Sequence, residues 1–405
     1  MGKSESGNGG APAGGGSDRA ESLLCVANFP ANTGYAWTFI ESLYAGLADA
    51  LAQREIRTWV AYPSVPSPPA TLARSAARPV ELPVELSSPA GLRALMEFIR
   101  RHGVRVLYLP DRPAWHPCYS WLRLAGVRRI VVHDHSSGAR TVPRGAKRVV
   151  KRWTRRLPGT VADVVVAVSD YVAQRKREVD LLPAERVLRI WNSIEIPPED
   201  AGAGARLRAA FGVVAGRPVI GCACRAVPEK GVAGLLRAFD RVWRASSEPR
   251  PSLVYLGDGP GFGELERVRS ELASQEAIVF GGYRPDAAEL LGGADICVVP
   301  SVWEEAFGLA ALEPMARGVA VVATRVGGVP EVVVDGETGL LVPPGDEAAL
   351  AAALERLLSD AALRRRLGEA GRRRAAELFG REVGVRRLLE VVEPGFRPPD
   401  RIGAR

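Results

Sequence analysis

The chain has 405 residues, which exceeds the roughly 250–300 residues that one hydrophobic core usually serves, so two domains are expected. Hydrophobic residues make up 47% and charged residues 25% of the chain, which excludes collagen-like, wholly disordered and disulfide-scaffold proteins. The formal net charge is +8, and no apolar run reaches the roughly 18–20 residues that a membrane span needs.

Residues 1–20 are rich in Gly, Ser and Ala and contain no apolar core of a signal peptide, so we expect a disordered tail there. The five cysteines include no Cys-x-x-Cys pair, and four of them fall in expected strands. Such a sparse set is typical of a reducing compartment, and it favours a cytoplasmic protein without a structural zinc site.

From Leu23 onward, short apolar runs alternate with segments of helical periodicity. Continuous apolar strands between helices indicate βαβ units and a parallel sheet covered on both faces. In the first half, strands are expected at Leu23–Ala27, Thr58–Tyr62, Val104–Leu109, Arg129–Val132 and Val164–Ser169, and helices at Tyr35–Gln53, Gly91–Arg101, Ala114–Leu124 and Arg144–Arg156.

The pattern lapses between residues 192 and 216 and then restarts. The expected fold is α/β, with two Rossmann-like doubly wound domains facing a central cleft, at residues 21–196 and 197–379. In the second half, strands are expected at Val219–Cys224, Ser252–Leu256, Ile278–Phe280, Ile296–Val299, Ala320–Ala323 and Gly339–Val342, and helices at Gly231–Arg244, Phe262–Ala273, Asp286–Leu291 and Phe307–Arg317, with two more from Asp346 to about Phe379.

The most informative segment runs from Pro300 to Glu331, where a strand ends, a loop carries two glutamates and Phe307-Gly308-Leu309 opens a helix. Backbone N–H groups at a helix start suit a diphosphate, and Gly308 permits close approach. A carboxylate there accepts hydrogen bonds from sugar or ribose hydroxyls, so we expect Glu305 and Glu313 to bind hydroxyl groups. A glycosidase acid–base pair fits less well, since eight helical residues rise about 12 Å and paired carboxyls need roughly 5–9.5 Å.

This segment resembles the donor-binding signature of retaining GT-B glycosyltransferases of family 4, also called group 1. In that family a glutamate precedes a Phe-Gly step and a second glutamate follows eight residues after the first, as Glu305 and Glu313 do here. The segments Thr324–Glu331 and Asp335–Asp346 match its usual ending. The resemblance covers nearly all of residues 217–360 and implies the GT-B fold, in which the last segment, here 380–405, crosses back onto the N-terminal domain.

The resemblance also assigns other donor-side residues. Arg225 and Lys230 would clamp the donor diphosphate, where fixed cations stabilise the charge of the leaving group. Gly257 and Gly259 would line the nucleotide pocket, and Tyr283 would lie near the base. The Gly257–Gly263 stretch lacks the GxGxxG spacing, which disfavours a dinucleotide-binding oxidoreductase.

Candidate residues of the N-terminal half follow expected strands. Gly34 comes after the first strand and would approach the donor phosphate, although the family often has two glycines in this loop. His133 and His135 follow the strand Arg129–Val132. The resemblance places a histidine at the reaction centre, and His133 is preferred by position, with His135 as the alternative. A plain helix-start loop and structural histidines are the competing interpretations.

The segment Arg140–Arg156 holds eight basic residues and no acidic one, with Val149, Val150 and Trp153 between them. A basic amphipathic helix docks on anionic lipid, so this segment is a candidate for peripheral contact with the inner face of the membrane. A solvated helix face is the alternative, and no recognised module favours nucleic-acid binding.

The resemblance thus predicts a retaining glycosyltransferase that moves a sugar from a nucleotide-sugar donor to an acceptor hydroxyl, in polysaccharide, glycolipid or glycoconjugate biosynthesis. Glu305 and His133 are the expected catalytic residues, and lipid-linked acceptors fit the basic segment. No cofactor and no divalent metal are expected, since no Asp-x-Asp motif occurs. The alternatives are a natural-product glycosyltransferase, a phosphorylase or epimerase of the same fold, and a non-catalytic nucleotide-sugar-binding module.

Overall fold

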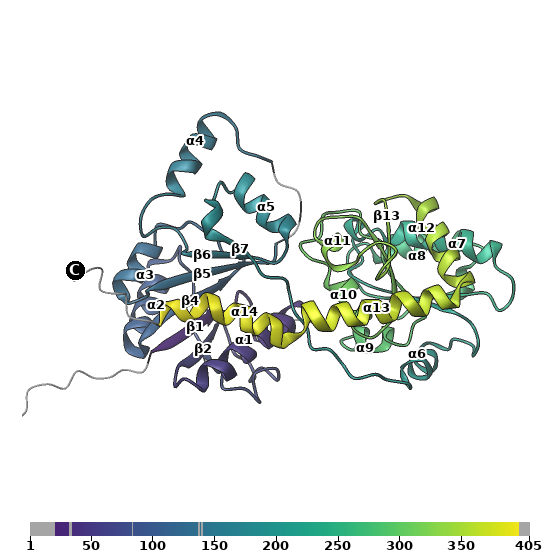
Figure 1. Cartoon of the computed structure of the whole chain (residues 1–405), viewed down its shortest axis with the longest axis horizontal. Helices are drawn as coiled ribbons and strands as arrows, with labels where there is room; N and C mark the ends of the chain where they lie inside the picture. The colour runs from purple at the N-terminus through teal and green to yellow at the C-terminus, as the bar shows by residue number, and fades with distance from the viewer. Residues whose placement is uncertain (1–20, 32–34, 83, 137, 139–140, 397–405) are drawn as a thin grey trace, which may run out of the picture.

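The computed structural model describes residues 21–31, 35–82, 84–136, 138 and 141–396. Two parallel β-sheets lie side by side, each with helices on both faces (Figure 1). The predicted α/β architecture of two doubly wound units is therefore confirmed. None of the described helices is both long and apolar enough to cross a membrane.

The N-terminal sheet has the strand order β3-β2-β1-β4-β5-β6-β7, and its strands pair in parallel. Its strands are β1 (Ser22–Val26), β2 (Arg57–Tyr62), β3 (Arg78–Glu81), β4 (Val104–Pro110), β5 (Arg129–Asp134), β6 (Val164–Ala167) and β7 (Val187–Arg189). The helices of this half are α1 (Tyr35–Ala52), α2 (Pro89–His102), α3 (Tyr119–Ala125), α4 (Gly145–Thr154) and α5 (Asp170–Glu178).

Both faces of this sheet are buried, which explains its continuous apolar strands. In β1, Leu23 and Cys25 face the apolar cluster that contains α1, whereas Leu24 and Val26 face the cluster that contains α2, α3 and α5. Successive side chains of a strand point to opposite faces, so one five-residue strand contributes to two cores.

The C-terminal sheet has the order β10-β9-β8-β11-β12-β13, again with parallel pairs. The strands are β8 (Val219–Ala223), β9 (Ser252–Leu256), β10 (Ile278–Phe280), β11 (Ile296–Val299), β12 (Ala320–Thr324) and β13 (Leu340–Val342). The helices are α6 (Ala203–Phe211), α7 (Val232–Ala245), α8 (Phe262–Ser270), α9 (Ala287–Leu291), α10 (Leu309–Met315), α11 (Val329–Val332), α12 (Glu347–Ser359), α13 (Ala361–Phe379) and α14 (Arg381–Val392).

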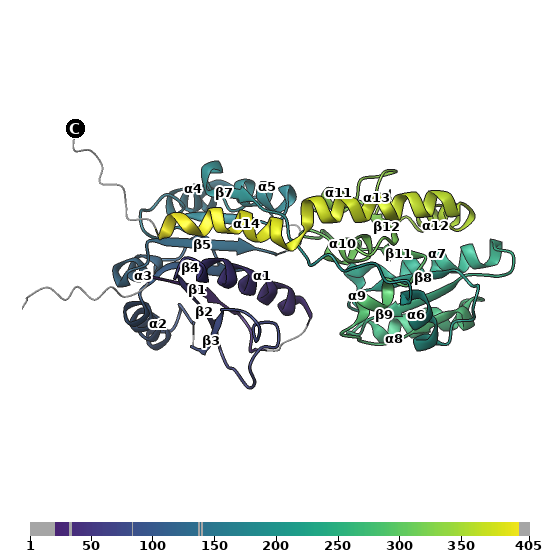
Figure 2. The same cartoon turned by 60° about the horizontal axis from the view of Figure 1, so that its bottom comes forward.

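The chain crosses between the two sheets after β7 and again at Gly380, where α13 ends. Helix α13 lies along the C-terminal sheet, and α14 continues onto the N-terminal sheet beside α1 (Figure 2). Gly46 of α1 permits this approach, because a Cβ there would fall 2.5 Å from Cγ2 of Val385 on α14.

The structure adds five elements that the sequence pattern did not predict, namely β3, α5, β7, α6 and α11. Strands β3 and β7 form the two edges of the N-terminal sheet and are short and charged, so they carry no period-two pattern. Helix α5 is polar and starts at a cap, in which the Ser169 side chain accepts a hydrogen bond from the Val172 N–H. Helix α6 falls within the lapse at residues 192–216.

Close packing of α13 on β12 depends on Gly368. A Cβ at this position would lie 2.1 Å from the carbonyl oxygen of Gly318, which is backbone and cannot move aside. We expect Gly368→Ala to lower the free energy of unfolding by about 1–3 kcal/mol. Gly263→Ala on the exposed face of α8, where no atom lies within 4 Å, should instead stabilise by up to about 0.5–1 kcal/mol. Urea denaturation of both variants checks the prediction, and equal effects would contradict it.

Candidate functional site

The candidate donor site lies where the order of the C-terminal sheet reverses, between β8 and β11. Ligands of doubly wound sheets bind at such switch points, beyond the carboxyl ends of the strands. The loop after β8 carries Arg225 and Lys230, and the loop after β11, residues 301–308, carries Glu304 and Glu305. The topology therefore brings together two segments that are far apart in the sequence.

Lys230 and Glu305 are in direct contact in this site. The Lys230 ammonium lies 2.5 Å from Oε1 of Glu305, and the Ser301 hydroxyl donates to the same oxygen at 2.6 Å. Both charged side chains remain partly exposed. An ammonium has three donors, so Lys230 can keep its contact with Glu305 and still bind an anionic ligand.

The neighbouring carboxylate of Glu304 is held elsewhere. It accepts a hydrogen bond from the Gly327 N–H, while the Gly328 N–H donates to the Glu305 carbonyl at 2.9 Å. Gly327 has φ 49°, and a Cβ there would lie 2.0 Å from the Glu305 carbonyl oxygen. Glycine is required at this turn for both reasons, and the turn leaves only Glu305 of the pair facing Lys230.

Glu313 of α10 lines a small cavity of about 20 Å³ together with Gly221 of β8 and Cys297 of β11. Burial raises the pKa of Glu313 to about 7, although the Arg317 guanidinium acts in the opposite direction. The carboxyl group therefore changes its charge near neutral pH. Gly308 at the start of α10 adopts φ 110°, a conformation that suits glycine.

The other predicted donor-side residues follow four neighbouring strands of the C-terminal sheet, namely β8, β9, β10 and β11. Arg225 and Tyr283 have exposed side chains, Leu309 is partly buried, and the Phe307 side chain is buried in the core, so Phe307 can meet a ligand only through its backbone. Gly257 permits close contact between two loops, because a Cβ there would lie 1.9 Å from the Cys224 carbonyl oxygen, and Gly259 has a similar role against Ala226. Gly34 lies outside the described residues.

Across from the donor site, His133 and His135 lie at the end of β5. Their rings are 4.1 Å apart, and Nδ1 of His133 lies 2.5 Å from the Tyr108 hydroxyl. His133 is 2% exposed, and the side chain of His135 is 12% exposed. Burial, and then the neighbouring His135, lowers the pKa of His133 well below its usual range, so its imidazole is neutral at pH 7.

Asp111, which the sequence analysis did not single out, fixes the position of His135. Its Oδ1 accepts the His135 N–H at 2.7 Å and lies 3.8 Å from Nδ1 of the ring. Asp111 has φ 51°, which is unusual for a residue other than glycine and is often found at functional sites. No sequence pattern marks this residue, since it depends on the pairing of β4 with β5.

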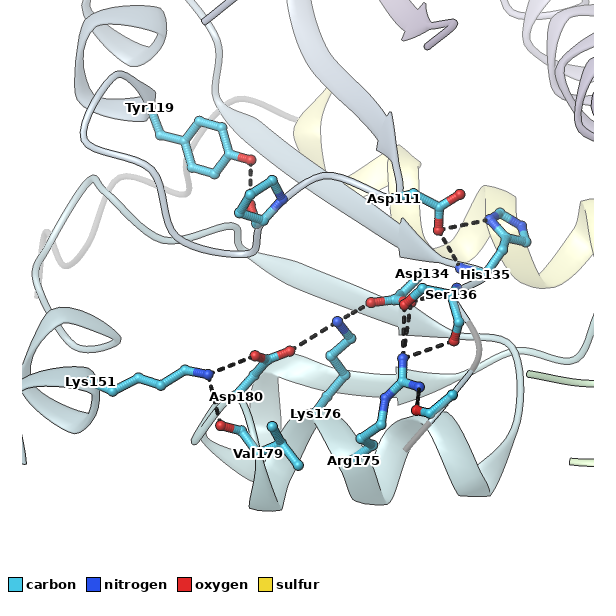
Figure 3. Close-up of polar contacts among 12 residues, drawn as sticks. Asp111, Tyr119, Asp134, His135, Ser136, Lys151, Arg175, Lys176, Val179 and Asp180 are labelled. Carbon is cyan, nitrogen blue, oxygen red and sulfur yellow. Dashed lines mark hydrogen bonds and ion pairs between the residues drawn. The ribbon is translucent and has the colours of Figure 1, made fainter. Parts of the chain in front are cut away.

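A buried chain of ion pairs supports the same strand end (Figure 3). Asp134, between the two histidines, pairs with Lys176 of α5, and Lys176 also lies 2.9 Å from Asp180. Asp180 lies 2.9 Å from Lys151 of α4. Burial by itself would raise the pKa of Asp134, but Lys176 and the hydrogen bonds from Ser136 outweigh it and hold the pKa below its usual range.

Arg175, the residue before Lys176 in α5, holds the loop after β5 close to the donor side. The Arg175 guanidinium donates to the Gly138 carbonyl at 2.6 Å and to the Ser136 carbonyl at 2.8 Å. The Gly138 N–H in turn donates to the Glu304 carbonyl at 3.1 Å. The two predicted halves of the site, which carry His133 and Glu305, are therefore connected through hydrogen-bonded backbone.

Comparison with known proteins assigns the chain to a family. The family model for glycosyl transferases group 1 matches residues 205–374, and the model for glycosyltransferase family 4 matches residues 40–196. A GDP-mannose-dependent alpha-(1-6)-phosphatidylinositol monomannoside mannosyltransferase from Mycolicibacterium smegmatis is 33% identical over 309 residues, which cover 71% of this chain and 76% of that protein. The chain belongs to the family 4, group 1 glycosyltransferases.

Solved structures agree on the fold. A glycosyltransferase from Rickettsia africae matches with a TM-score of 0.78 and 20% identity, over 94% of this chain and 100% of that chain. Anabaena HepE in complex with UDP-glucose matches with a TM-score of 0.73 and 20% identity, over 92% of this chain and 99% of that chain. The fold of this glycosyltransferase is therefore GT-B, as the sequence predicts.

The raised pKa of Glu313 gives a pH-dependent stability. Between its ordinary pKa of 4.5 and about 7, the folded state binds more protons at this carboxyl group than the unfolded state, so stability falls as pH rises through that window. Glu313→Gln removes this loss. We expect the melting temperature of the variant, relative to the unchanged protein, to be a few degrees higher at pH 8 than at pH 5.

Glu369→Gln, on the exposed face of α13, is the matched control and should show no such difference. Differential scanning fluorimetry at both pH values makes the measurement. A relative stability of Glu313→Gln that stays constant between pH 5 and pH 8 would contradict the assigned pKa.

Proposed function

We propose that this protein transfers a sugar from a nucleotide-sugar donor to an acceptor hydroxyl, with retention of anomeric configuration and without a divalent metal. The observation that carries the proposal is the contact of Lys230 with Glu305 at the switch point of the C-terminal sheet. A cation for phosphate and a carboxylate for sugar hydroxyls are the two groups that a sugar diphosphate needs side by side. The pathway we propose is polysaccharide, glycolipid or glycoconjugate biosynthesis.

Each donor-side residue then has a role that suits its position. Arg225 and Lys230 bind the diphosphate, and the N–H groups at Gly308 and Leu309 add donors at the start of α10. Glu305 accepts hydrogen bonds from the sugar hydroxyls and Glu313 from the ribose. The roles of Gly257, Gly259 and the backbone of Phe307 are to line the pocket, with Tyr283 beside the base.

In the reaction, the bond between the anomeric carbon and the diphosphate oxygen breaks, and its electron pair stays on the diphosphate. The fixed charges of Arg225 and Lys230 stabilise this leaving group more strongly as its charge grows. The acceptor oxygen then bonds to the anomeric carbon and gives its proton to the diphosphate oxygen that has just left. His133, neutral and held by Tyr108, is the proposed hydrogen-bonding partner at the reaction centre, with His135 as the alternative.

The acceptor is proposed to be lipid-linked, because α4 offers a basic and apolar surface. Its apolar side chains Val149, Val150 and Trp153 are exposed, the last by 71%. The exposed cations around them are Arg144, Lys147, Arg148, Arg152 and Arg156. The Mycolicibacterium smegmatis relative is named for a phosphatidylinositol acceptor, which is an anionic lipid.

Two of the predicted basic residues do not belong to this surface. Lys151 points inward to Asp180 and to the Val179 carbonyl oxygen at 2.8 Å, and Arg155 lies over the ring of Trp115. Arg140, the first residue of the predicted basic segment, lies outside the described residues. Contact with the inner face of a membrane, and hence a cytoplasmic location, is part of the proposal.

Calorimetric titration of UDP, GDP and ADP in excess chelator tests the donor site. One of the three should bind, and Lys230→Ala should weaken it by about 1.5–3 kcal/mol, the loss typical of a hydrogen bond to a charged group. Lys147→Ala on α4 is the matched control and should leave the affinity unchanged. Binding that needs added magnesium would contradict the metal-free proposal, and unchanged affinity of Lys230→Ala would contradict the proposed role of Lys230 in binding the diphosphate.

Product analysis without acceptor separates a transferase from an epimerase, which would release an isomerised sugar nucleotide.

Vesicle binding tests the proposed surface on α4. Val150 and Val214 are both 62% exposed, and Val214 lies in the other half of the molecule. Val150→Asp should weaken binding to vesicles of phosphatidylglycerol and phosphatidylcholine by about tenfold, because it removes apolar area and adds a negative charge. Val214→Asp should leave binding unchanged. Equal binding of both variants in a sedimentation assay would refute the membrane contact.

A further inference from the structure

Glu331 of α11 connects the two domains through its carboxylate. Its Oε2 accepts hydrogen bonds from the Asp170 N–H and from Nε1 of Trp191, both at 2.8 Å, and its Oε1 accepts from the Tyr171 N–H at 3.1 Å. All three donors belong to the N-terminal half. Asp170 and Tyr171 open helix α5, where unpaired N–H groups and the helix dipole favour a negative charge.

A second contact joins the same two segments. The Ser169 hydroxyl accepts the Val172 N–H at 3.1 Å, which caps α5, and donates to the Ala306 carbonyl oxygen at 2.5 Å. Ala306 lies in the 301–308 loop, directly after Glu305. The N-terminus of α5 therefore rests on the loop that carries the candidate sugar-binding carboxylate.

The segment before Glu331 is bonded to that loop from the other side. Gly327 and Gly328 donate their N–H groups to the Glu304 carboxylate and to the Glu305 carbonyl. Only two residues separate this turn from Glu331. Any movement of Glu331 away from α5 therefore moves the backbone to which Glu304 and Glu305 are bonded.

Aromatic side chains at the crossing points of the chain complete the connection. Trp191 lies under the Arg189 guanidinium, at 3.9 Å from its ring centroid, and its edge meets Phe379 at 5.2 Å. Phe379 in turn meets Phe307 at 5.6 Å. Trp191 therefore contacts Glu331 through its Nε1 and the donor loop through Phe379.

We propose that Glu331 is a positioning residue that couples closure of the two domains to the placement of Glu305. This inference rests on the proposed function, in which Glu305 binds the donor sugar. With α5 seated on Glu331, the 301–308 loop is held between the 327–328 turn and Ser169. When the domains separate, the carboxylate loses its three donors and the loop loses its contact with Ser169, so Glu305 is in its bound position only in the closed form.

Trp191→Phe is the sharpest test, because it removes one hydrogen bond from the N-terminal half and keeps the aromatic ring. Glu331→Gln is its partner, since an amide has one acceptor oxygen where the carboxylate uses two, so it cannot accept from Asp170, Tyr171 and Trp191 together. We expect both variants to increase deuterium uptake in the 301–308 loop and to lower kcat for release of GDP from GDP-mannose or UDP from UDP-glucose by about tenfold. The affinity for the free nucleoside diphosphate should stay within about twofold.

Matched controls separate this role from a loss of stability. Trp243 also lies under an arginine, Arg250 at 4.3 Å, but its buried Nε1 has no hydrogen-bond partner among the described residues, so Trp243→Phe should change neither exchange nor kcat. Glu369→Gln should behave in the same way. The double variant of Trp191 and Glu331 should be slower by less than the product of the two single effects, because both substitutions weaken contacts of the same carboxylate.

The outcomes are distinct. The proposal is overturned if Trp191→Phe keeps both the deuterium uptake of the 301–308 loop and the kcat of the unchanged protein. It is also overturned if nucleotide affinity and kcat fall by the same factor. If Glu331→Gln lowers the melting temperature but leaves deuterium exchange in the 301–308 loop unchanged, Glu331 is a structural contact and the proposal is wrong. If the unchanged protein transfers no sugar from any donor, the proposed function fails, and the exchange measurement still decides whether the N-terminal half controls the loop.

Discussion

In the proposed donor site two adjacent carboxylates lie beside the position of an anionic ligand, and the surrounding loops are built around this constraint. Glu304 and Glu305 would repel each other and an incoming phosphate if both faced the same space. The fold gives each its own donors, since Glu304 accepts from Gly327 and Glu305 from Lys230 and Ser301. This division depends on Gly327, because no side chain fits between its backbone and the Glu305 carbonyl oxygen.

The N-terminal domain meets a different constraint at the end of β5, because its charged side chains are buried in ion pairs rather than held apart. Asp134, Lys176 and Arg175 are each less than 10% exposed. Removing such groups from water is unfavourable unless all of them are paired, and loss of one partner leaves an uncompensated charge. The network therefore fixes the end of β5, where His133 and His135 lie, in one geometry. Through Lys151 and Asp180 the same ion pairs hold α4, which carries the proposed membrane surface.

The sequence predicts those features whose signals are local. Continuous apolar runs predict the central strands, and the spacing of Glu305, the Phe-Gly step and Glu313 gives the resemblance from which the donor segment is proposed. The edge strands β3 and β7 escape prediction, because no alternating pattern can develop in only four and three residues, of which Arg78, Glu81 and Arg189 are charged. Lys176 had a compositional clue, as one of only five lysines beside 49 arginines, but its partner Asp134 follows from the fold.

The contacts of Glu331 and Ser169 could not have been predicted from the sequence, for a further reason. Their partners lie 161 and 137 residues away, in the other domain, and each residue type is common on protein surfaces. Whether Ser169 caps a helix, contacts a loop or does both depends on how the two sheets meet. A local pattern contains no information on that arrangement.

The contacts between the domains fit the proposed closure, in which the domains must separate to admit the donor. The aromatic contacts of Trp191, Phe379 and Phe307 lie where the chain crosses between the sheets, so they can persist during a rotation. The contacts of Glu331 and Ser169 with α5 are hydrogen bonds, which water replaces at a small net free-energy change. An apolar contact in their place would hold the cleft shut, because its exposure to water is unfavourable in proportion to its area. In the proposed opening, the aromatic contacts therefore stay in place while the hydrogen bonds of Glu331 and Ser169 break. Only these hydrogen bonds need to break for the donor to enter.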